Sequence, residues 1–503
     1  MKRLGRWLSV WLLCALLASA GALGAAAAST GFRDVPAGHW AASYINQAVE
    51  KGLIQGETAT TFGLGHPMTR AAFTVVLCRF FGWEMQTPAS GSFTDNQDPS
   101  AWYYSAVETA CANGAVTRQS SRFRPADPVT REEMAVALIR ALGYTTLAGI
   151  DQGMACPFRD VESNKGYLTM AYYLGISGGT SAATFSPEST ATREQAVVML
   201  MRVYDRYLRQ TPGRIGVASS ANGLTDLTGF QAVAVSGARL TATGAVTALP
   251  AEPEAQLIRE TARAAGASAL LGVTGSQNAL QADPAVTAAA VAEAAADYEG
   301  VLLDVRELPF KQRLAYTRLV TALRESLGKK LLYVTAEVPD SSGREYGYDY
   351  GALSARADRL ILRAAPYSRE INGIPTTPLE PLEEIYYALA LLKGQIDPAK
   401  CSLWLTTTGL TRKGSRDGAV TAEAICDLLA QPETEEYYSA RYAEAYLIRT
   451  VNKSTTAVWY HDQRAVEARV RLCAFFGVEE VCLSNLCSVA DDSGYSLLRG
   501  LEE

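Results

Sequence analysis

The sequence has few of the residues that build metal and redox sites. Its 503 residues include 3 histidines, and none of its 9 cysteines stands in a Cys-x-x-Cys pair. Histidine and closely spaced cysteine are the usual ligands of protein-bound zinc. We therefore predict no metal site, and the sequence gives no reason to expect a cofactor.

The sequence also lacks an excess of basic residues. Its 46 Lys and Arg are outnumbered by 52 Asp and Glu, and the formal net charge is −6. Proteins that bind nucleic acid, or that adhere to an anionic membrane by charge, carry positive charge. We predict neither partner. A hydrophobic content of 48% and a charged content of 19% indicate globular domains.

Long apolar runs are absent except at the start of the chain. Lys2, Arg3 and Arg6 precede the apolar run 7–18, and small residues continue to Ala28. This run is too short to cross a bilayer, which takes roughly 20 apolar residues. We predict that residues 1–28 are a cleaved signal peptide, that the protein is secreted, and that the mature chain has no membrane span.

One pattern recurs three times between residues 31 and 202. Its opening elements are Phe32-Arg33-Asp34, Phe93-Thr94-Asp95 and Phe158-Arg159-Asp160. A glycine-containing loop follows in each copy, and the closing elements are Thr69-Arg70, Thr130-Arg131-Glu132 and Thr192-Arg193-Glu194. Chance rarely produces such agreement in order and spacing. The sequence therefore predicts three modules, at residues 31–90, 91–150 and 156–207.

Each copy is typical of two helices joined by a loop. The repeated threonine has the position of a helix N-cap, and Glu133 and Gln195 stand three residues later, as in a capping box. A single helix pair cannot bury its apolar face, so we expect the three copies to pack into one all-α bundle.

The arginine that follows each capping threonine is the candidate binding group. Arg70, Arg131 and Arg193 stand in the first turn of a helix, where the helix dipole by itself would favour an acid. A cation beside unpaired helix N–H groups suits an anionic ligand. The alternative is that each arginine only pairs with the aspartate of its own Phe-x-Asp turn.

Together these elements resemble S-layer homology modules over about 175 residues. The resemblance implies grooves between modules that hold a pyruvylated secondary cell-wall polysaccharide, at the surface of a Gram-positive-type bacterium. Carried over by position, the ligand-binding set is Asp34, Trp40, Arg70, Asp95, Trp102, Arg131, Asp160 and Arg193. Copy three departs most, with Tyr167 near the position of the tryptophan, and copy one has Ala72 in place of the acid. We therefore expect Arg131 to contribute more to binding than Arg193.

The remainder of the chain alternates short apolar strands with helices. Residues 208–229 are rich in Gly, Ser, Thr and Pro and are predicted to be a linker. Strands are expected at 231–235, 269–274, 300–305, 330–336, 358–363, 402–406, 456–460 and 480–484. Such units favour a parallel (β/α)8 TIM barrel over residues 230–503. An open doubly wound sheet is the alternative, but no Gly-rich phosphate loop follows its first strand.

Two segments of this region resemble family 18 glycoside hydrolases, particularly those that act on peptidoglycan. Residues 299–306 align with the family's Asp-Gly-x-x-x-Asp-x-Glu strand, and 458–462 with its Trp-Phe-Glu-Asp element. The resemblance implies a barrel that acts on peptidoglycan or chitin-type glycan, with Arg306, Tyr460 and Asp462 at its mouth. However, Arg306 replaces the catalytic acid, and a guanidinium cannot donate a proton at neutral pH. Glu299 replaces the opening aspartate, and residues 363–366 replace Met-x-Tyr-Asp.

Three hypotheses remain for the barrel. It is a degenerate glycosidase that binds glycan or protein, a working hydrolase with a re-sited pair of carboxylates, or a structural S-layer subunit. For the second, the candidates are Asp304, Glu307 and Glu337, with Glu307 expected to point away from the lumen unless a bulge re-aims it. Cleavage needs carboxyls about 5 Å apart, or roughly 6.5–9.5 Å. The simpler alternative is that these acids pair with Arg306, Arg344 or Arg363.

Overall fold

The computed structural model describes two compact units of the chain. The described residues are 31–150, 154–207, 212–222, 224, 226–342, 346–364, 369–371, 374–413, 416–488 and 497–501. The predicted signal peptide, Arg344 and residues 365–366 therefore lie outside them. The described parts of Met1–Gly143, Phe158–Asn164 and Ile176–Tyr204 form the first unit. Those of Tyr144–Pro157, Lys165–Gly175 and Asp205–Glu503 form the second.

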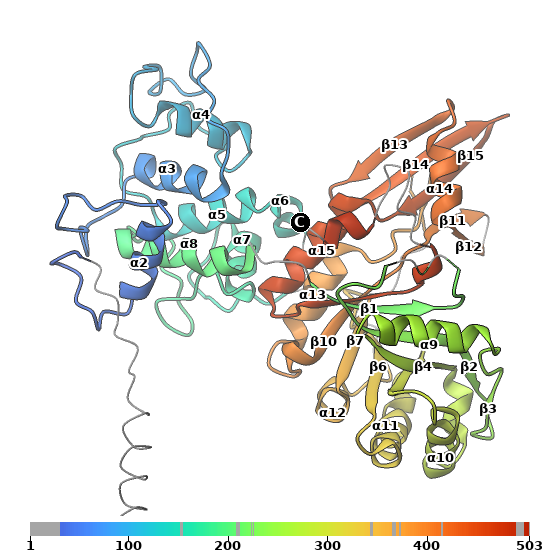
Figure 1. Cartoon of the computed structure of the whole chain (residues 1–503). Coiled ribbons are helices and arrows are strands. Elements are labelled where there is room, and N and C mark those ends of the chain that lie inside the picture. Colours follow the sequence, from blue (N-terminus) through green and yellow to red (C-terminus); the bar gives the residue numbers. More distant parts are fainter. Residues whose placement is uncertain are drawn as a thin grey trace, which may run out of the picture. The chain divides into compact units, whose positions relative to one another are not determined.

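The helices of the amino-terminal region follow the repeat (Figure 1). They are α2 (Ala42–Glu50) and α3 (Arg70–Phe81) from copy one, α4 (Tyr104–Ala112) and α5 (Arg131–Ala141) from copy two, and α7 (Lys165–Tyr173) and α8 (Arg193–Tyr207) from copy three. The predicted helix pair is thus present in each copy. A short α6 (Thr145–Gly149) follows α5, and both α6 and α7 group with the second unit.

The capping threonines begin the second helix of each pair as predicted. Thr69 accepts a hydrogen bond from the Ala72 N–H, and Thr130 forms the complete capping box with Glu133. In copy three, the Thr192 N–H donates to Gln195 Oε1 at 3.3 Å. Isolated β-bridges join the three copies in a cycle: Pro67 to Thr192, Thr69 to Pro128, and Thr130 to Thr190. Backbone bridges therefore link the three copies, while a single all-α bundle of the three copies stays a prediction.

The second unit contains a closed barrel of eight parallel strands, as expected for a TIM barrel. The strands are β1 (Gly213–Ala218), β2 (Phe230–Leu240), β4 (Ser268–Gly275), β5 (Gly300–Val305), β6 (Leu331–Glu337), β7 (Arg359–Arg363), β10 (Cys401–Leu405) and β16 (Glu480–Leu483). β1 pairs with β16 on one side and with β2 on the other, which closes the sheet. The open doubly wound alternative is wrong. A short β3 (Val246–Thr247) adds antiparallel to β2.

Two sequence predictions about this barrel are wrong. The stretch 208–229, predicted to be a linker, contains β1, so the barrel begins before residue 230. The expected barrel strand at 456–460 belongs instead to β15 (Ser454–Tyr460), which pairs with neighbours outside the barrel. The first error arises because the short β1 has the composition of a linker. The second arises because a local apolar pattern reveals a strand but not the sheet that it joins.

β15 lies in an antiparallel insert of five strands that follows β10. Its other strands are β11 (Gly409–Lys413), β12 (Arg416–Val420), β13 (Thr434–Ser439) and β14 (Glu444–Val451). One face of the insert packs against α14 (Ala422–Leu429), where Ile425 meets Leu447 and Val458 in a buried cluster. A hairpin of β8 (Arg369–Ile371) and β9 (Ile374–Thr376) precedes it.

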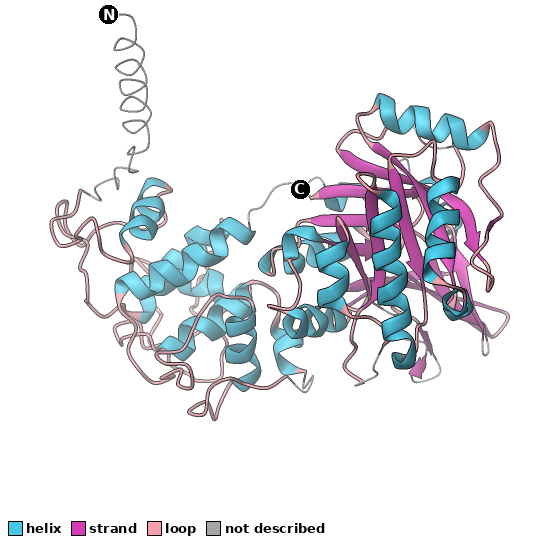
Figure 2. Ribbon diagram, turned by 90° about the horizontal axis from the view of Figure 1, so that it is seen from below, coloured by secondary structure: helices cyan, strands magenta, loops and turns pink. Residues whose placement is uncertain are grey.

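Helices cover the outside of the barrel, as Figure 2 shows in cyan around the magenta strands. They are α9 (Glu254–Ala264), α10 (Pro284–Ala294), α11 (Arg313–Leu327), α12 (Tyr350–Arg356), α13 (Leu382–Leu392) and α15 (Gln463–Phe475). Inside, one buried cluster takes residues from every barrel strand, among them Ile215, Leu302, Ile361 and Trp404. Because side chains alternate along a strand, Asp304 and Arg363 lie on the same inward face as Leu302 and Ile361, nearer the carboxyl ends.

No helix among the described residues combines the length and the apolar character that a membrane span requires.

Candidate functional site

Three aspartates of the repeat hold the loops of their own copies. Asp34 accepts hydrogen bonds from the Phe62, Gly63 and Leu64 N–H groups at 2.7–3.0 Å. Asp95 and Asp160 accept the equivalent bonds from residues 123–124 and 185–186 at 2.7–2.8 Å. Burial would raise the pKa of Asp34 and Asp95, but these donors outweigh it, and the pKa of all three is lowered. The carboxylates stay charged and fix the loops.

Each repeated arginine reaches the loop of the next copy. Arg70 Nε donates to the Phe123 carbonyl at 2.7 Å, Arg131 Nε to that of Phe185 at 3.0 Å, and Arg193 Nε to that of Phe62 at 2.9 Å. Each guanidinium also lies over the ring of the same phenylalanine, 4.9–5.0 Å from its centroid. The alternative that each arginine pairs with the aspartate of its own turn is therefore wrong. We call these contacts junctions one, two and three, after the copy that supplies the arginine.

The three junctions differ in the second partner of the arginine. At junction one, Arg70 forms an ion pair with Glu133. At junction two, Arg131 Nη2 donates to the Gly178 carbonyl at 2.8 Å, and no carboxylate among the described residues lies within 4 Å. At junction three, Arg193 Nε lies 3.8 Å from Glu57. Only at junction two is the repeated cation without a protein counter-ion in the described part of the chain.

Of the predicted binding set, the two tryptophans stand apart from the arginines. Trp40 and Trp102 are 56% and 67% exposed, which is high for such large apolar side chains. Among the described residues, neither tryptophan makes a cation–π contact with a junction arginine. Trp40 lies beside His39, and Trp102 lies beside Tyr103. The structure thus joins the aspartates and arginines through the loops, while the tryptophans remain exposed platforms.

At the barrel mouth, Asp304 is enclosed by cations. Its carboxylate oxygens lie 2.6 Å from Arg306 Nη2 and 3.2 Å from Arg363 Nη1, and Thr335 Oγ1 donates to it at 2.7 Å. Burial alone would raise the pKa of Asp304, but Arg363 and Arg306 hold it below its ordinary value. A carboxylate in this state has no proton to give to a leaving group. The pairing that the sequence offered as the simpler alternative is present for Asp304.

The two other candidate carboxylates lie beside this cluster. Glu337 ends β6, and its Oε1 accepts a hydrogen bond from the Glu307 N–H at 3.1 Å. Glu307 is exposed, and its backbone has a left-handed conformation, with φ 55°. Arg363 is stacked on Trp404 with its guanidinium carbon 3.9 Å from the ring centroid. The structure thus brings Asp304, Glu307 and Glu337 to one end of the barrel, and a catalytic role for them stays a prediction.

Tyr460 and Asp462 do not have the positions predicted for them. Tyr460 is buried between the insert and α14, and its hydroxyl donates to Glu436. Asp462 is the N-cap of α15, accepts from the Ala465 N–H at 2.8 Å and pairs with Arg464. Both differences follow from the assignment of β15 to the insert.

Sequence analysis missed a buried network between the insert and the barrel. His461 Nε2 lies 3.3 Å from Glu380 and 3.8 Å from Glu444, and Arg469 Nη2 donates to Glu444 at 2.8 Å. Burial raises the pKa of Glu380 to about 7 and that of Glu444 to about 8, and it lowers the pKa of His461 well below its ordinary value. One guanidinium cannot balance two carboxylates, so the pair retains a proton at neutral pH. Glu380 and Glu444 are far in sequence from His461 and Arg469 and lie in no motif, and the motif at 458–462 that includes His461 does not indicate a network.

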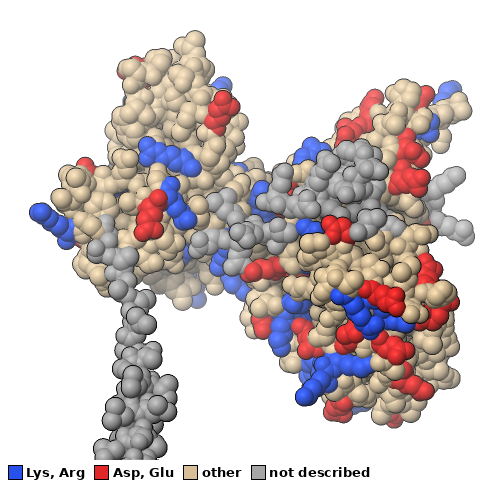
Figure 3. All heavy atoms as spheres, viewed as in Figure 1, with Lys and Arg blue, Asp and Glu red and all other residues tan. Residues whose placement is uncertain are grey.

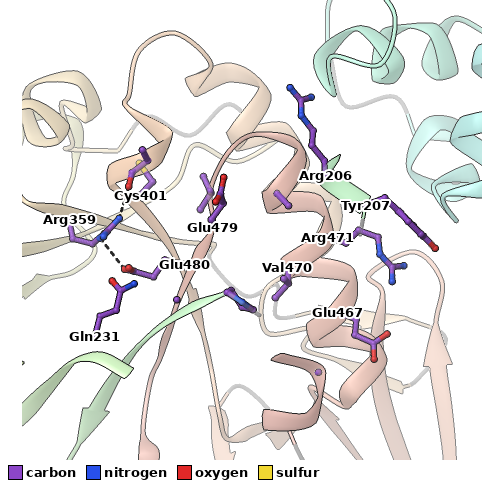
Figure 4. Close-up of a pocket in the computed structure, with 16 residues that line it drawn as sticks. Arg206, Tyr207, Gln231, Arg359, Cys401, Glu467, Val470, Arg471, Glu479 and Glu480 are labelled. Atoms are coloured by element: carbon purple, nitrogen blue, oxygen red, sulfur yellow. Dashed lines mark hydrogen bonds and ion pairs between the residues drawn. The ribbon is translucent and has the colours of Figure 1, made fainter. Parts of the chain in front are cut away.

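One sizeable cavity beside the barrel lies away from this mouth. A cavity of about 590 Å³ opens at the amino ends of the strands, where Gln231, Arg359, Cys401 and Glu480 lie (Figure 4). Arg359 and Glu480 pair at 3.0 Å, and Ser402 donates to Glu480 at 2.6 Å. In TIM barrels, chemistry is found at the carboxyl ends and stabilising contacts at the amino ends. We therefore assign this cavity no role in chemistry, despite its size.

Comparison with known proteins agrees with the repeat. The S-layer homology domain matches residues 31–74, 93–135 and 157–197. An S-layer protein of Bacillus thuringiensis subsp. finitimus is 30% identical over 180 residues, which is 35% of this chain and 22% of that protein. An endoglucanase of Bacillus sp. strain KSM-635 is 31% identical over 179 residues, which is 34% of this chain and 18% of that protein. The chain thus spans about a fifth of the length of these relatives.

The second unit resembles solved chitinases in fold. A class V chitinase from Pseudomonas fluorescens Pf-5 superposes with a TM-score of 0.50 at 18% identity, and the match covers 58% of this chain and 99% of that one. At this identity, the likeness shows the fold alone. The expected glycosidase-like barrel is confirmed at that level.

These findings define a cell-surface protein that carries a glycosidase-like barrel. More particularly, the chain contains three S-layer homology domains followed by a barrel with the fold of solved chitinases. The predicted location at the cell surface or cell wall is confirmed by these domains and by their S-layer relatives.

Proposed function

We propose that the protein is held non-covalently on the wall by its three modules and displays a barrel that binds glycan without cleaving it. The ligand of the modules is a secondary cell-wall polysaccharide with acidic, pyruvylated groups. The observation that supports anchoring is the cycle of three arginines, each fixed between two copies by a carbonyl and an aromatic ring. A guanidinium held in this way suits a carboxylate ligand.

Anchoring is tested by sedimentation of the full chain with purified Gram-positive walls. The walls are used intact or after hydrogen fluoride has removed their polysaccharide. We expect the protein in the pellet with intact walls and in the supernatant with stripped walls. Equal sedimentation with both would show that peptidoglycan or another component is the ligand, and anchoring by the polysaccharide would be rejected.

For the barrel, the supporting observation is the charge at the site of the expected acid. Arg306 stands at that position and pairs with Asp304. Asp304 has the position of the aspartate that precedes the acid in the family's motif, and the guanidinium now beside it cannot give a proton to a leaving group. The aromatic and charged side chains at the mouth remain able to bind a sugar. We propose that the ligand is peptidoglycan or chitin-type glycan.

The alternative is a working hydrolase that uses a re-sited pair of carboxylates. The hydrogen bond from the Glu307 N–H to Glu337 favours it, because it brings both residues to the mouth beside Asp304. The test incubates the full chain with soluble peptidoglycan and chitin-type oligosaccharides, measures binding by calorimetry and separates the products by chromatography. We expect binding without new products. Products that disappear in Glu307→Gln or Glu337→Gln would establish the hydrolase.

A further inference from the structure

The loops that meet the repeated arginines differ in charge. In each loop, the residues on either side of the contacted phenylalanine have equivalent positions. Beside Phe123 at junction one they are Arg122 and Arg124. Beside Phe185 at junction two they are Thr184 and Ser186, and beside Phe62 at junction three they are Thr61 and Gly63. Two additional cations are therefore peculiar to junction one.

A cavity of about 420 Å³ lies at junction one. Four guanidinium groups and two carboxylates line it, from Arg70, Arg122, Arg124, Arg140, Glu132 and Glu133. Glu132 is held by the Ser163 hydroxyl at 2.8 Å and the Asn164 amide at 2.5 Å. The lining therefore has an excess of positive charge, and one of its two acids is engaged with neutral donors. The volume is in the range of pockets that accept small ligands such as one or two sugars.

The two loop arginines remain available to a ligand. The side chains of Arg122 and Arg124 are 69% and 54% exposed. Their nearest carboxylates, on Asp95, Asp127 and Glu133, lie 3.5–3.7 Å away. Exposed ion pairs with long separations contribute little free energy, so a ligand carboxylate can displace them at little cost.

Glu133 lies between two of these arginines. Its Oε1 pairs with Arg70 and lies 3.5 Å from Arg124 Nη2. A carboxylate between two guanidinium groups marks where an acidic group of the ligand would be favourable. The other junctions lack these additional cations, because no arginine stands next to the contacted phenylalanine beside Arg131 at junction two or beside Arg193 at junction three.

We propose that junction one is the principal anion site of the modules and that Arg122 and Arg124 determine its preference for a polysaccharide with closely spaced carboxylates. This rests on the proposed function of the modules and adds an order among the junctions, with junction one first, junction two second and junction three last. Arg122 and Arg124 bind the acidic groups from the loop, while Arg70 closes the cavity behind them.

The test is a binding isotherm of the full chain on intact, purified Gram-positive walls. The variant R122T/R124S gives junction one the side chains that junction two has. The control R33T/R202S removes two exposed arginines elsewhere in the modules, so it has the same net charge as R122T/R124S. Charge-assisted hydrogen bonds are the strong ones, so we expect R122T/R124S to weaken binding about tenfold or more and the control to bind like the wild type.

A second variant guards against a loss caused by misfolding. T184R/S186R transplants the two arginines to junction two, where Ser186 has the same left-handed backbone as Arg124, with φ 59° at both residues. It should bind the walls more tightly than the wild type. Unchanged binding by both double variants would overturn the order of the junctions and leave anchoring intact. A wild-type chain that does not bind intact walls would refute both the order and the proposed function.

Discussion

At the scale of single residues, our proposal that the barrel binds glycan without cleaving it depends on Arg306. The position of the family's acid is Arg306, and the charge at this point is reversed. Asp304 keeps its place but is enclosed by Arg306, Arg363 and Thr335. An aspartate that stabilises a reaction intermediate must be free to face the substrate, and here it faces two guanidinium groups. We therefore interpret the cluster as a structural ion pair.

The stability of this ion pair can be measured by substitution. Arg363 and Asp304 are both buried, so Arg363→Met leaves the Asp304 carboxylate with the half-exposed Arg306 as its remaining cation. This substitution should lower the unfolding free energy by about 3 kcal/mol or more. D304N/R363M, which leaves no buried carboxylate, should recover part of that loss. The half-exposed Arg306 is the matched control, and Arg306→Gln should cost about 1 kcal/mol or less. Urea unfolding of the wild type, these three variants and Asp304→Asn provides the values, and losses at Asp304 and Arg363 that simply add in D304N/R363M would show that the two residues do not interact.

The buried glutamates predict a pH dependence of stability. The pKa of Glu380 is raised to about 7 and that of Glu444 to about 8, so the folded chain holds protons that the unfolded chain releases. The unfolding free energy should therefore fall as pH rises through these values. His461 is neutral in both states above about pH 6.5 and adds nothing there. We expect the urea midpoint to decrease between about pH 6.5 and 8.

The control for this effect replaces both carboxyls by isosteric amides. E380Q/E444Q retains groups that can accept from Thr406 and from the Leu379 N–H, the present donors to these residues. Its midpoint should be nearly independent of pH over the same range. An equal slope in the variant would assign the pH dependence to other groups.

At the scale of helices and strands, the sequence was informative where a pattern is local. The repeat placed six helices and their capping threonines, because capping and apolar spacing are properties of short segments. It could not show that Arg70 contacts the Phe123 loop and not its own aspartate. That partner lies in the next copy, and equivalent motifs do not specify which copies meet. The same limit hid the network of Glu380, Glu444 and Arg469.

The barrel shows a second limit of the same kind. Seven of its eight strands were predicted, and the missing strand is β1. β1 reads Gly-Arg-Ile-Gly-Val-Ala and follows a segment rich in polar and small residues, so its composition is that of a linker. In the structure its Ile215 is fully buried in the cluster that fills the barrel. Burial of a strand on both faces is a tertiary property that a six-residue segment does not reveal.

The role of β1 predicts which fragments fold. A fragment of residues 212–503 keeps the strand that pairs with both β2 and β16. A fragment of residues 230–503 leaves those two strands as open edges, which favour aggregation. Circular dichroism and size-exclusion chromatography should find a cooperative, monomeric protein for the longer fragment and aggregates for the shorter one. A cooperative, monomeric 230–503 fragment would show that β1 is dispensable.

At the scale of the whole molecule, the two units differ in how charged residues are distributed on their surfaces. The described face of the second unit carries interspersed acidic and basic residues without a field of one sign (Figure 3). This pattern gives no support for binding nucleic acid. The first unit presents arginines at the junctions between copies, and we propose that its partner is a polymer with repeated acidic groups. On this proposal, the modules place a glycan-binding barrel at the wall, where its ligand is abundant.

The most direct measurement follows protein and product in the same tube. The full chain is incubated with intact, purified walls, the walls are sedimented, and protein in the pellet and reducing ends in the supernatant are both quantified. The account predicts that the protein is in the pellet and that reducing ends do not exceed those of a blank without protein. Reducing ends that Glu337→Gln abolishes would contradict it, and so would wild-type protein that remains in the supernatant.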